Sequence, residues 1–249
     1  MKPNVTSSLL LLLILGAPVL AELAYADEVP PANVLFVGNS FTYYNNSLHN
    51  HYRRLLRASV PDGELTGYAR IITISGGYLP EHAGLPAMLD SRQWDAVVLQ
   101  GHSRGPISEE SAEPFREAAR RFAKAIRDAG AEPVFFMTWA YDGRPEMTTQ
   151  LESAYTSIGR ELNAQVVPVG LAFATVTSDR SDIALRIADA RHPAVAGTYL
   201  AACTFFAVLQ NKSPQGLPYD AGLGAETAAY LQGVAWETVV AYRDRESAY

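Results

Sequence analysis

The sequence predicts an α/β fold in which a parallel β-sheet carries helices on both faces. The first observation is a series of five short apolar stretches, each with the length and composition of a strand that is buried on both sides. The second is that segments with helical periodicity lie between these stretches. Strands that alternate with helices in this way are typical of parallel sheets.

The expected strands are, in chain order, residues 33–38, 69–75, 95–100, 133–138 and 165–169. The clearest helix is 109–129, where Phe115 and Phe122 belong to one apolar face and Arg and Lys side chains occupy the other. Further helices are expected at 47–59, at the strongly apolar segment 194–209 and at 225–242, with 213–224 as the long loop. In such sheets the ligand crevice lies beyond the carboxyl ends of the strands, so we expect the functional residues directly after each strand.

The first 26 residues have the features of a secretory signal peptide. Lys2 precedes an apolar run at 9–15, and Ala24-Tyr25-Ala26 has the small-x-small pattern of a cleavage site. The run is shorter than the roughly 20 residues that a membrane span needs. We therefore expect an exported protein, periplasmic or secreted, in which residues 27–249 form a single domain without a stable membrane anchor after cleavage.

Charge and cysteine content exclude several classes of function. The net charge is −6 and no run of Lys and Arg occurs, which argues against nucleic acid as a partner. The single cysteine, Cys203, excludes an internal disulfide and a zinc site built from thiolates. We expect no metal cluster from the histidines, because residues at i and i+2 of a helix face different directions. The histidines considered are His49, His51, His82 and His102.

A serine follows the first expected strand, in the run Gly38-Asn39-Ser40-Phe41-Thr42. Backbone N–H groups at a helix start have no partner within the helix and favour a developing negative charge. A serine at this position is either a nucleophile or a plain helix N-cap, a role that Ser and Asn both fill well. The run by itself leaves both alternatives open.

A second candidate motif, Asp189-Ala190-Arg191-His192-Pro193, lies near the end of the chain. The proline disfavours helical geometry at His192 and suits the first position of the following helix. On such a turn the Asp189 carboxylate can reach the imidazole Nδ1, which fixes the tautomer and leaves Nε2 to act as a base. The motif alone also fits an ordinary surface turn, whereas its combination with Ser40 in one crevice indicates a serine hydrolase.

These two motifs resemble those of the SGNH or GDSL-like hydrolases. Gly38-Asn39-Ser40 is similar to the nucleophile block, with Asn39 where Asp is more usual, and Asp189-x-x-His192-Pro193 is similar to the Asp/His block. The resemblance implies a flavodoxin-like, three-layer α/β/α sandwich with a five-stranded parallel sheet. It also implies a serine-dependent esterase or acylesterase without metal or cofactor, with Ser40 as nucleophile, His192 as base and Asp189 as the carboxylate that orients it.

In that family, two further blocks supply the oxyanion hole together with the backbone N–H of the nucleophile. The resemblance implies that Ser40 provides this N–H here. One contributes a glycine N–H after the second strand, where Ser75-Gly76-Gly77 lies here. We favour Gly76 as the oxyanion donor, with Gly77 as the alternative. If Gly76 is the donor, Gly77 is expected to contact the substrate. Two glycines can also simply form a turn.

The remaining block usually contributes an Asn side chain, and that Asn is absent from Gln100-Gly101-His102-Ser103. The segment is similar to the Gln-Gly-Glu-Ser of carbohydrate-acetylesterase branches, which implies Gln100 as the third donor because its amide carries the required NH₂. His102 and Ser103 would then line the substrate-binding rim. Trp139 and Tyr141, at the end of the fourth strand, are candidates either for stacking on a sugar or for ordinary packing.

A competing nucleophile is Ser103, because Gly101-His102-Ser103-Arg104-Gly105 matches the Gly-x-Ser-x-Gly elbow of the α/β-hydrolases. Two observations favour Ser40 instead. No His-Gly-Gly motif precedes the elbow, and Asp189 and His192 lie only three residues apart.

The sequence thus predicts an exported esterase whose substrate is a small ester or an acylated polysaccharide. The O-acetyl groups of a carbohydrate are one candidate for the ester that it hydrolyses. The alternatives are a lipase or thioesterase that uses the same residues, and a catalytically silent module that binds glycan in the same crevice. The absence of the third-block Asn motivates the last alternative.

Overall fold

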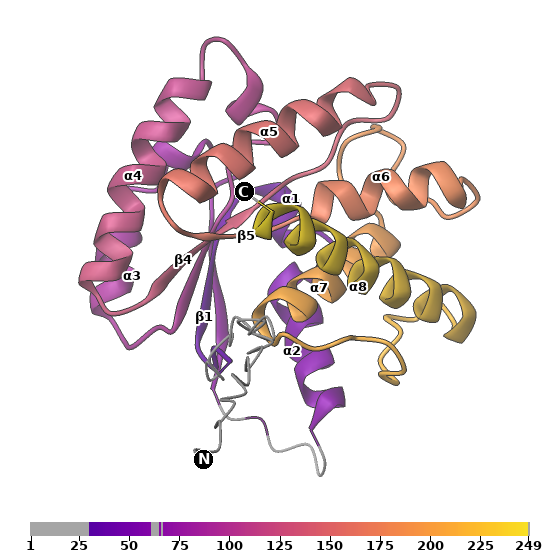
Figure 1. The fold of residues 1–249 in the computed structure, drawn as a ribbon. Helices are drawn as coiled ribbons and strands as arrows, with labels where there is room; N and C mark the ends of the chain where they lie inside the picture. The colour runs from indigo at the N-terminus through magenta and orange to yellow at the C-terminus, as the bar shows by residue number, and fades with distance from the viewer. Residues whose placement is uncertain (1–29, 61–64, 66, 249) are drawn as a thin grey trace, which may run out of the picture.

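The computed structural model describes residues 30–60, 65 and 67–248, and its strands form one parallel sheet (Figure 1). The expected signal peptide, residues 1–26, lies outside the described residues. The strands are β1 (Val34–Gly38), β2 (Ala69–Thr73), β3 (Ala96–Leu99), β4 (Glu132–Phe136) and β5 (Gln165–Val167). The α-helices are α1 (Ser40–Tyr43), α2 (Leu48–Ser59), α3 (Leu85–Asp90), α4 (Ala112–Asp128), α5 (Glu146–Glu161), α6 (Val169–Asp179), α7 (Val195–Leu209) and α8 (Ala225–Ser247). Two short 3₁₀ helices are η2 (Leu79–Glu81) and η3 (Gly105–Ile107).

The strand order is β2-β1-β3-β4-β5. Val34 of β1 pairs with Ala69 of β2 on one side and with Ala96 of β3 on the other, and every pairing is parallel. The chain therefore reverses its direction of travel across the sheet between β1 and β3. In a parallel sheet such a switch point leaves a crevice beyond the carboxyl ends of the two strands, and this crevice holds the candidate site.

Alternate residues of each strand face opposite helical layers. Val34 and Phe36 belong to a core with α2, α6, α7 and α8, whereas Leu35 and Val37 belong to a second core with α3, α4 and α5. Figure 1 shows the same separation, with α3, α4 and α5 on one side of the sheet and α2, α7 and α8 on the other. The expected three-layer α/β/α sandwich with a five-stranded parallel sheet is confirmed.

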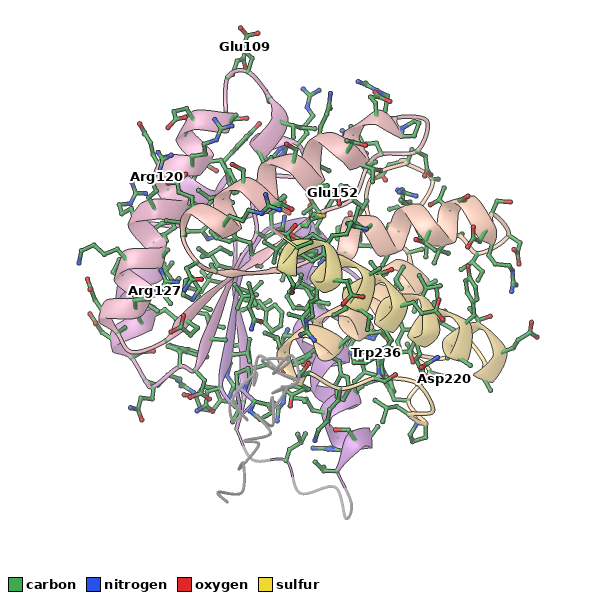
Figure 2. The ribbon with its side chains drawn as sticks, in the orientation of Figure 1. Glu109, Arg120, Arg127, Glu152, Asp220 and Trp236 are labelled. Atoms are coloured by element: carbon green, nitrogen blue, oxygen red, sulfur yellow. The ribbon has the colours of Figure 1, made fainter. Side chains whose placement is uncertain are left out.

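The helix expected at 109–129 is α4, and its polarity is as its periodicity predicts. Phe115 and Phe122 are buried against the sheet, while Arg120 and Arg127 point outward from the helix (Figure 2). Arg120 reaches across to Glu161 at the end of α5, with Nε and Oε1 2.6 Å apart. None of the described helices is long and apolar enough to cross a membrane.

Several expected boundaries differ from the structure. The strand expected at 165–169 ends at Val167, because Pro168 interrupts it and α6 begins at Val169. The helix after His192 begins at Val195, and Pro193 is not its first residue but forms an antiparallel bridge with Arg186. Three helices, α3, α5 and α6, were not expected from the sequence.

Candidate active site

The switch point opens into a pocket of about 620 Å³ at the carboxyl ends of β1, β3 and β4. Its lining combines residues of both motifs with a set of tyrosines and two arginines. The lining residues are Asn39, Ser40, Phe41, Tyr43, Tyr44, Ser75, Gly76, Tyr78, His102, Ser103, Arg104, Tyr141, Arg191 and His192.

Ser40 is the first residue of α1, directly after the end of β1. Asn39 is the N-cap of this helix, and its Oδ1 accepts a hydrogen bond from the Phe41 N–H at 3.1 Å. The Asn39 Nδ2 donates to the Gly77 carbonyl at 3.1 Å, which joins the Ser40 turn to the loop after β2. The capping role that Ser40 could have had therefore belongs to Asn39, and the Ser40 hydroxyl is left for other contacts.

Ser40, His192 and Asp189 form a continuous chain of hydrogen bonds. Ser40 Oγ lies 2.9 Å from His192 Nε2, and His192 Nδ1 lies 2.5 Å from Asp189 Oδ2. The other carboxylate oxygen, Oδ1, accepts the backbone N–H groups of Arg191 and His192, each at 2.9 Å. Two segments 152 residues apart thus meet at one side of the pocket.

The Asp189 carboxyl is held in its charged form. Partial burial by itself raises its pKa, but the hydrogen bonds from the His192 side chain and from the backbone N–H groups of Arg191 and His192 together lower the pKa to about 2. A carboxylate that stays ionised at neutral pH accepts the proton of Nδ1–H, which leaves the lone pair of Nε2 directed at the Ser40 hydroxyl.

The turn that carries His192 is fixed to the rest of the fold through its carbonyl groups. Trp139 Nε1 donates to the Arg191 carbonyl at 2.9 Å, and Asn45 Nδ2 donates to the Pro193 carbonyl at 2.7 Å. Ala190 adopts a left-handed backbone with φ 63° and accepts from the Asp142 N–H at 3.0 Å. A residue other than glycine rarely adopts this backbone conformation unless its surroundings impose it, so the turn is preorganised.

Aromatic rings also fix the orientation of the His192 imidazole. Tyr44 stacks on it with ring centroids 4.5 Å apart and an interplanar angle of 10°. Phe41 meets it edge-on at 5.7 Å and stacks in turn on Trp139 at 4.3 Å. Trp139 is fully buried, so of the two aromatic residues considered for sugar stacking only Tyr141 lines the pocket.

The backbone N–H groups of Ser40 and Gly76 have no acceptor among the described residues, and both residues line the pocket. Gly76 has φ 65°, a conformation in which glycine carries no steric penalty. The neighbouring Gly77 N–H donates to the Ile74 carbonyl at 3.0 Å, and Gly77 is absent from the lining. Of the two glycines, only Gly76 therefore has a donor to offer a ligand.

The expectation for Gln100 does not match the structure. Gln100 is 1% exposed, and its Nε2 donates to Asn39 Oδ1 at 2.7 Å and to the Gly101 carbonyl at 2.9 Å. Both amide hydrogens are thus used, and the side chain does not line the pocket. Gln100 acts as a brace that holds Asn39, and through it the turn at Ser40, rather than as a donor to an oxyanion.

His102 and Ser103 line the pocket as expected, but Ser103 lacks the surroundings of a nucleophile. Its Oγ lies 2.5 Å from the Tyr141 hydroxyl, and no hydrogen bond to a histidine occurs in the described part of the chain. The segment after β3 continues into the short η3 instead of the helix that a nucleophile elbow requires. His102 stacks on Tyr78 with centroids 4.3 Å apart.

Several pocket residues were not expected from the sequence. The pocket lining also includes Tyr43, Tyr44, Ser75, Tyr78, Arg104 and Arg191. Ser75, Arg104 and Arg191 lie inside the motifs, but the sequence suggested no role for them. The one signal that the sequence offers is their position within or next to the motifs, no more than four residues from Ser40, Gly76, Ser103 or His192. Among residues 30–60, 65 and 67–248, no group of three or more His, Cys, Asp or Glu side chains is placed to hold a metal ion.

Comparison with known proteins identifies the fold. No family model and no curated protein matches the sequence. A candidate SGNH hydrolase from Slackia heliotrinireducens is 26% identical with a TM-score of 0.59, covering 72% of this chain and 98% of that one. The acetylxylan esterase Axe2 from Geobacillus stearothermophilus is 20% identical with a TM-score of 0.57, covering 71% and 93%. A DUF4886 family protein from Bacteroides uniformis is 17% identical with a TM-score of 0.62, covering 84% and 94%.

The chain therefore has the fold of the SGNH hydrolases, and the resemblance expected from its motifs is confirmed at this level. Its structural neighbours include hydrolases and esterases, which supports an enzyme that acts on carboxylic ester bonds.

Proposed function

Because the chain has the SGNH hydrolase fold, we propose that it is a serine esterase in which Ser40 is the nucleophile, His192 the general base and Asp189 the carboxylate that orients the imidazole. The observation that carries the proposal is the 2.9 Å separation of Ser40 Oγ and His192 Nε2, continued by the 2.5 Å separation of His192 Nδ1 and Asp189 Oδ2. The spacing of the two motif residues also has a parallel. Catalytic variants of Axe2 replace an aspartate and a histidine that lie three positions apart, as Asp189 and His192 do.

In the first half of the reaction, His192 Nε2 removes the hydroxyl proton as Ser40 Oγ attacks the ester carbonyl carbon. The carbonyl oxygen becomes an oxyanion, which the unpaired N–H groups of Ser40 and Gly76 are free to bind. The C–O bond to the alcohol then breaks, and His192 gives its proton to the departing alkoxide. The products of this half are the free alcohol and an acyl-Ser40 ester.

In the second half, a water molecule replaces the alcohol. His192 Nε2 takes a proton from the water while its oxygen attacks the acyl carbon, and the same N–H groups bind the new oxyanion. Collapse of this intermediate releases the carboxylic acid and returns the proton to Ser40 Oγ. Asp189 remains ionised throughout, because its lowered pKa keeps it deprotonated at neutral pH.

An acylated carbohydrate is the substrate class that we favour. The acetylxylan esterase among the structural neighbours supports a carbohydrate ester. Four tyrosines of the pocket lining add to this support, because aromatic rings with a polar end can both stack on a sugar ring and bond its hydroxyls. Export to the periplasm or the exterior, as expected from residues 1–26, belongs to this proposal and is tested by sequencing the N-terminus of the mature protein.

The proposal is tested with Ser40→Ala and Ser103→Ala, assayed on p-nitrophenyl acetate. Ser40→Ala is expected to lower kcat by roughly 10³-fold or more, because the residual rate then comes from binding and the oxyanion donors alone. Ser103→Ala is the matched control, since it removes a hydroxyl from the same pocket without touching His192. Longer acyl chains in the same assay distinguish an acetylesterase from a lipase or thioesterase.

Two results would contradict the proposal. A larger loss in Ser103→Ala than in Ser40→Ala would make Ser103 the nucleophile. The absence of hydrolysis of every ester by the folded wild-type protein would favour a silent glycan-binding module.

A further inference from the structure

We propose that the alcohol portion of the substrate is an anionic sugar, and that Arg104 and Arg191 bind its negative group. This inference rests on the proposed function, since it names the substrate class of the same site. The ligand chemistry is a carboxylate, as in a uronic acid, or a sulfate or phosphate ester carried on the sugar. A guanidinium group can form paired hydrogen bonds with each of these anions.

The first observation is the charge of the pocket lining. Arg104 and Arg191 are both exposed and both line the pocket, and no Asp or Glu is among the lining residues. The whole chain has a net charge of −6. A local excess of positive charge on an acidic protein attracts anions to one place and repels them elsewhere, so it provides specificity for an anionic ligand.

The second observation is that the carboxylates near the pocket already have partners. Asp189 binds His192 and two backbone N–H groups. Glu81 accepts the Tyr78 N–H at 2.7 Å, and Asp142 forms an ion pair of 2.6 Å with Arg186. Within the described residues neither Arg104 nor Arg191 has an ion pair with a carboxylate. Other described arginines, such as Arg57, also form no ion pair with a described carboxylate, but Arg104 and Arg191 differ from Arg57 because they line the pocket.

The third observation is that one tyrosine contacts Arg191 and also Ser103, the residue before Arg104. The Arg191 guanidinium lies over the Tyr141 ring, 5.8 Å from its centroid. Arg104 follows Ser103, whose Oγ lies 2.5 Å from the Tyr141 hydroxyl. Arg104, Tyr141 and Arg191 line the same pocket, so we infer that a sugar bound against Tyr141 is held beside these two cationic residues.

The direction of the reaction assigns the charge to the alcohol and not to the acyl group. His192 Nε2 delivers its proton to the departing alkoxide, so the alcohol lies beside the turn that carries His192. Arg191 is the residue directly before His192 in that turn. The acyl carbonyl oxygen, in contrast, points toward the N–H groups of Ser40 and Gly76. A negative group near Arg191 is thus part of the sugar.

The test compares three substrates that carry one acetyl group on the same hydroxyl. They are an acetylated methyl glucuronide, the corresponding neutral methyl glucoside, and the glucoside bearing a 6-sulfate. We expect kcat/KM to be roughly tenfold or more higher for at least one anionic sugar than for the neutral one, because a charge-assisted bidentate contact is stronger than a neutral contact. The sulfate and the glucuronide together show which anion the pocket prefers. High salt is expected to reduce the preference, because it screens exposed charges.

The matched variants are Arg104→Gln, Arg191→Gln and the control Arg57→Gln, which changes an exposed arginine in the last turn of α2, outside the pocket lining. Each pocket variant is expected to bring the anionic-to-neutral ratio of kcat/KM toward about 1, and Arg57→Gln to leave the ratio unchanged.

Equal kcat/KM for the three sugars, or a preference that survives in both pocket variants, would overturn the inference while leaving the esterase proposal intact. If none of the sugars and no p-nitrophenyl acetate is hydrolysed, the proposed function fails, and this inference fails with it.

Discussion

Replacing Asp189 with Asn tests the proposed role of the carboxylate without dismantling the turn that holds it. The Asp189 Oδ1 accepts two backbone N–H groups at 2.9 Å, and an Asn oxygen can accept both. The Asn NH₂ then occupies the place of Oδ2, 2.5 Å from His192 Nδ1. An NH₂ group donates where the carboxylate accepts, so Nδ1 loses its proton and the proton moves to Nε2.

With Nε2 protonated, the imidazole donates to Ser40 Oγ and no longer accepts its proton. In serine hydrolases with a comparable triad this change of tautomer lowers kcat by about 10⁴-fold, which corresponds to about 5.4 kcal/mol of barrier. We expect a loss of that order for Asp189→Asn on p-nitrophenyl acetate, with the variant still folded at the assay temperature.

The assay measures kcat and the unfolding temperature of the same preparation. A variant that is folded in the assay and keeps more than about a tenth of the wild-type kcat would exclude the proposed role of Asp189, because the carboxylate would then contribute little to orienting the base.

Three further predictions concern the scaffold of the site. Gly38→Ala should lower the free energy of unfolding by about 1–3 kcal/mol, since the new Cβ would lie 2.4 Å from Gln100 Oε1. An unchanged midpoint of unfolding in urea would contradict this close packing. Asn45→Ala should lower the free energy of unfolding by about 2 kcal/mol and also lower kcat, because the Asn45 amide donates to the Pro193 carbonyl at 2.7 Å and to Thr198 Oγ1 at 2.8 Å. Unchanged stability and kcat would show that the turn does not need these hydrogen bonds. Burial, assisted by the charges of neighbouring arginines, lowers the pKa of His49 to about 4. The folded state therefore binds a proton at His49 less readily than the unfolded state does. As a result, the free energy of unfolding falls as the pH drops from about 6.5 toward 4. His49→Gln should therefore reduce the stability difference between pH 7 and pH 5 by about 2 kcal/mol, and an identical difference in variant and wild type would contradict the assignment.

The sheet could be predicted from the sequence because its strands are buried on both faces. Leu35 and Phe36 face different helical layers, and both are fully buried, so the strand appears in the sequence as a continuous apolar run. The same property hid α6, which begins at Val169 directly after β5 and Pro168. A short apolar run does not distinguish a buried strand from a buried helix by periodicity, and the boundary between the two was misplaced for this reason.

The site could be predicted in part, because the two motifs carry their chemistry in adjacent residues. Asp189 and His192 lie on one turn, and Ser40 directly follows a strand, so local sequence suffices to suggest a contact once the sheet is expected. Gln100 shows the limit of this approach. Its amide has the right chemistry for a donor, but its two hydrogens are used by Asn39 and Gly101, and only the three-dimensional packing reveals this.

The arginines of the pocket could not be predicted for a related reason. Arg104 and Arg191 are two of many arginines in an acidic chain, and the sequence does not show which carboxylates are already paired. The structure supplies that information for Glu81 and Asp142 through their contacts with Tyr78 and Arg186.

In the proposed mechanism, His192 activates the hydroxyl of Ser40. A fluorophosphonate probe measures this activation, because it reacts with an activated serine. The rate of labelling is followed, and the labelled residue is identified by peptide mass spectrometry. We expect an adduct on the peptide that contains Ser40, none on the peptide that contains Ser103, and a much slower reaction in folded His192→Ala. An adduct on Ser103, or labelling of Ser40 at the same rate without the imidazole, would contradict it.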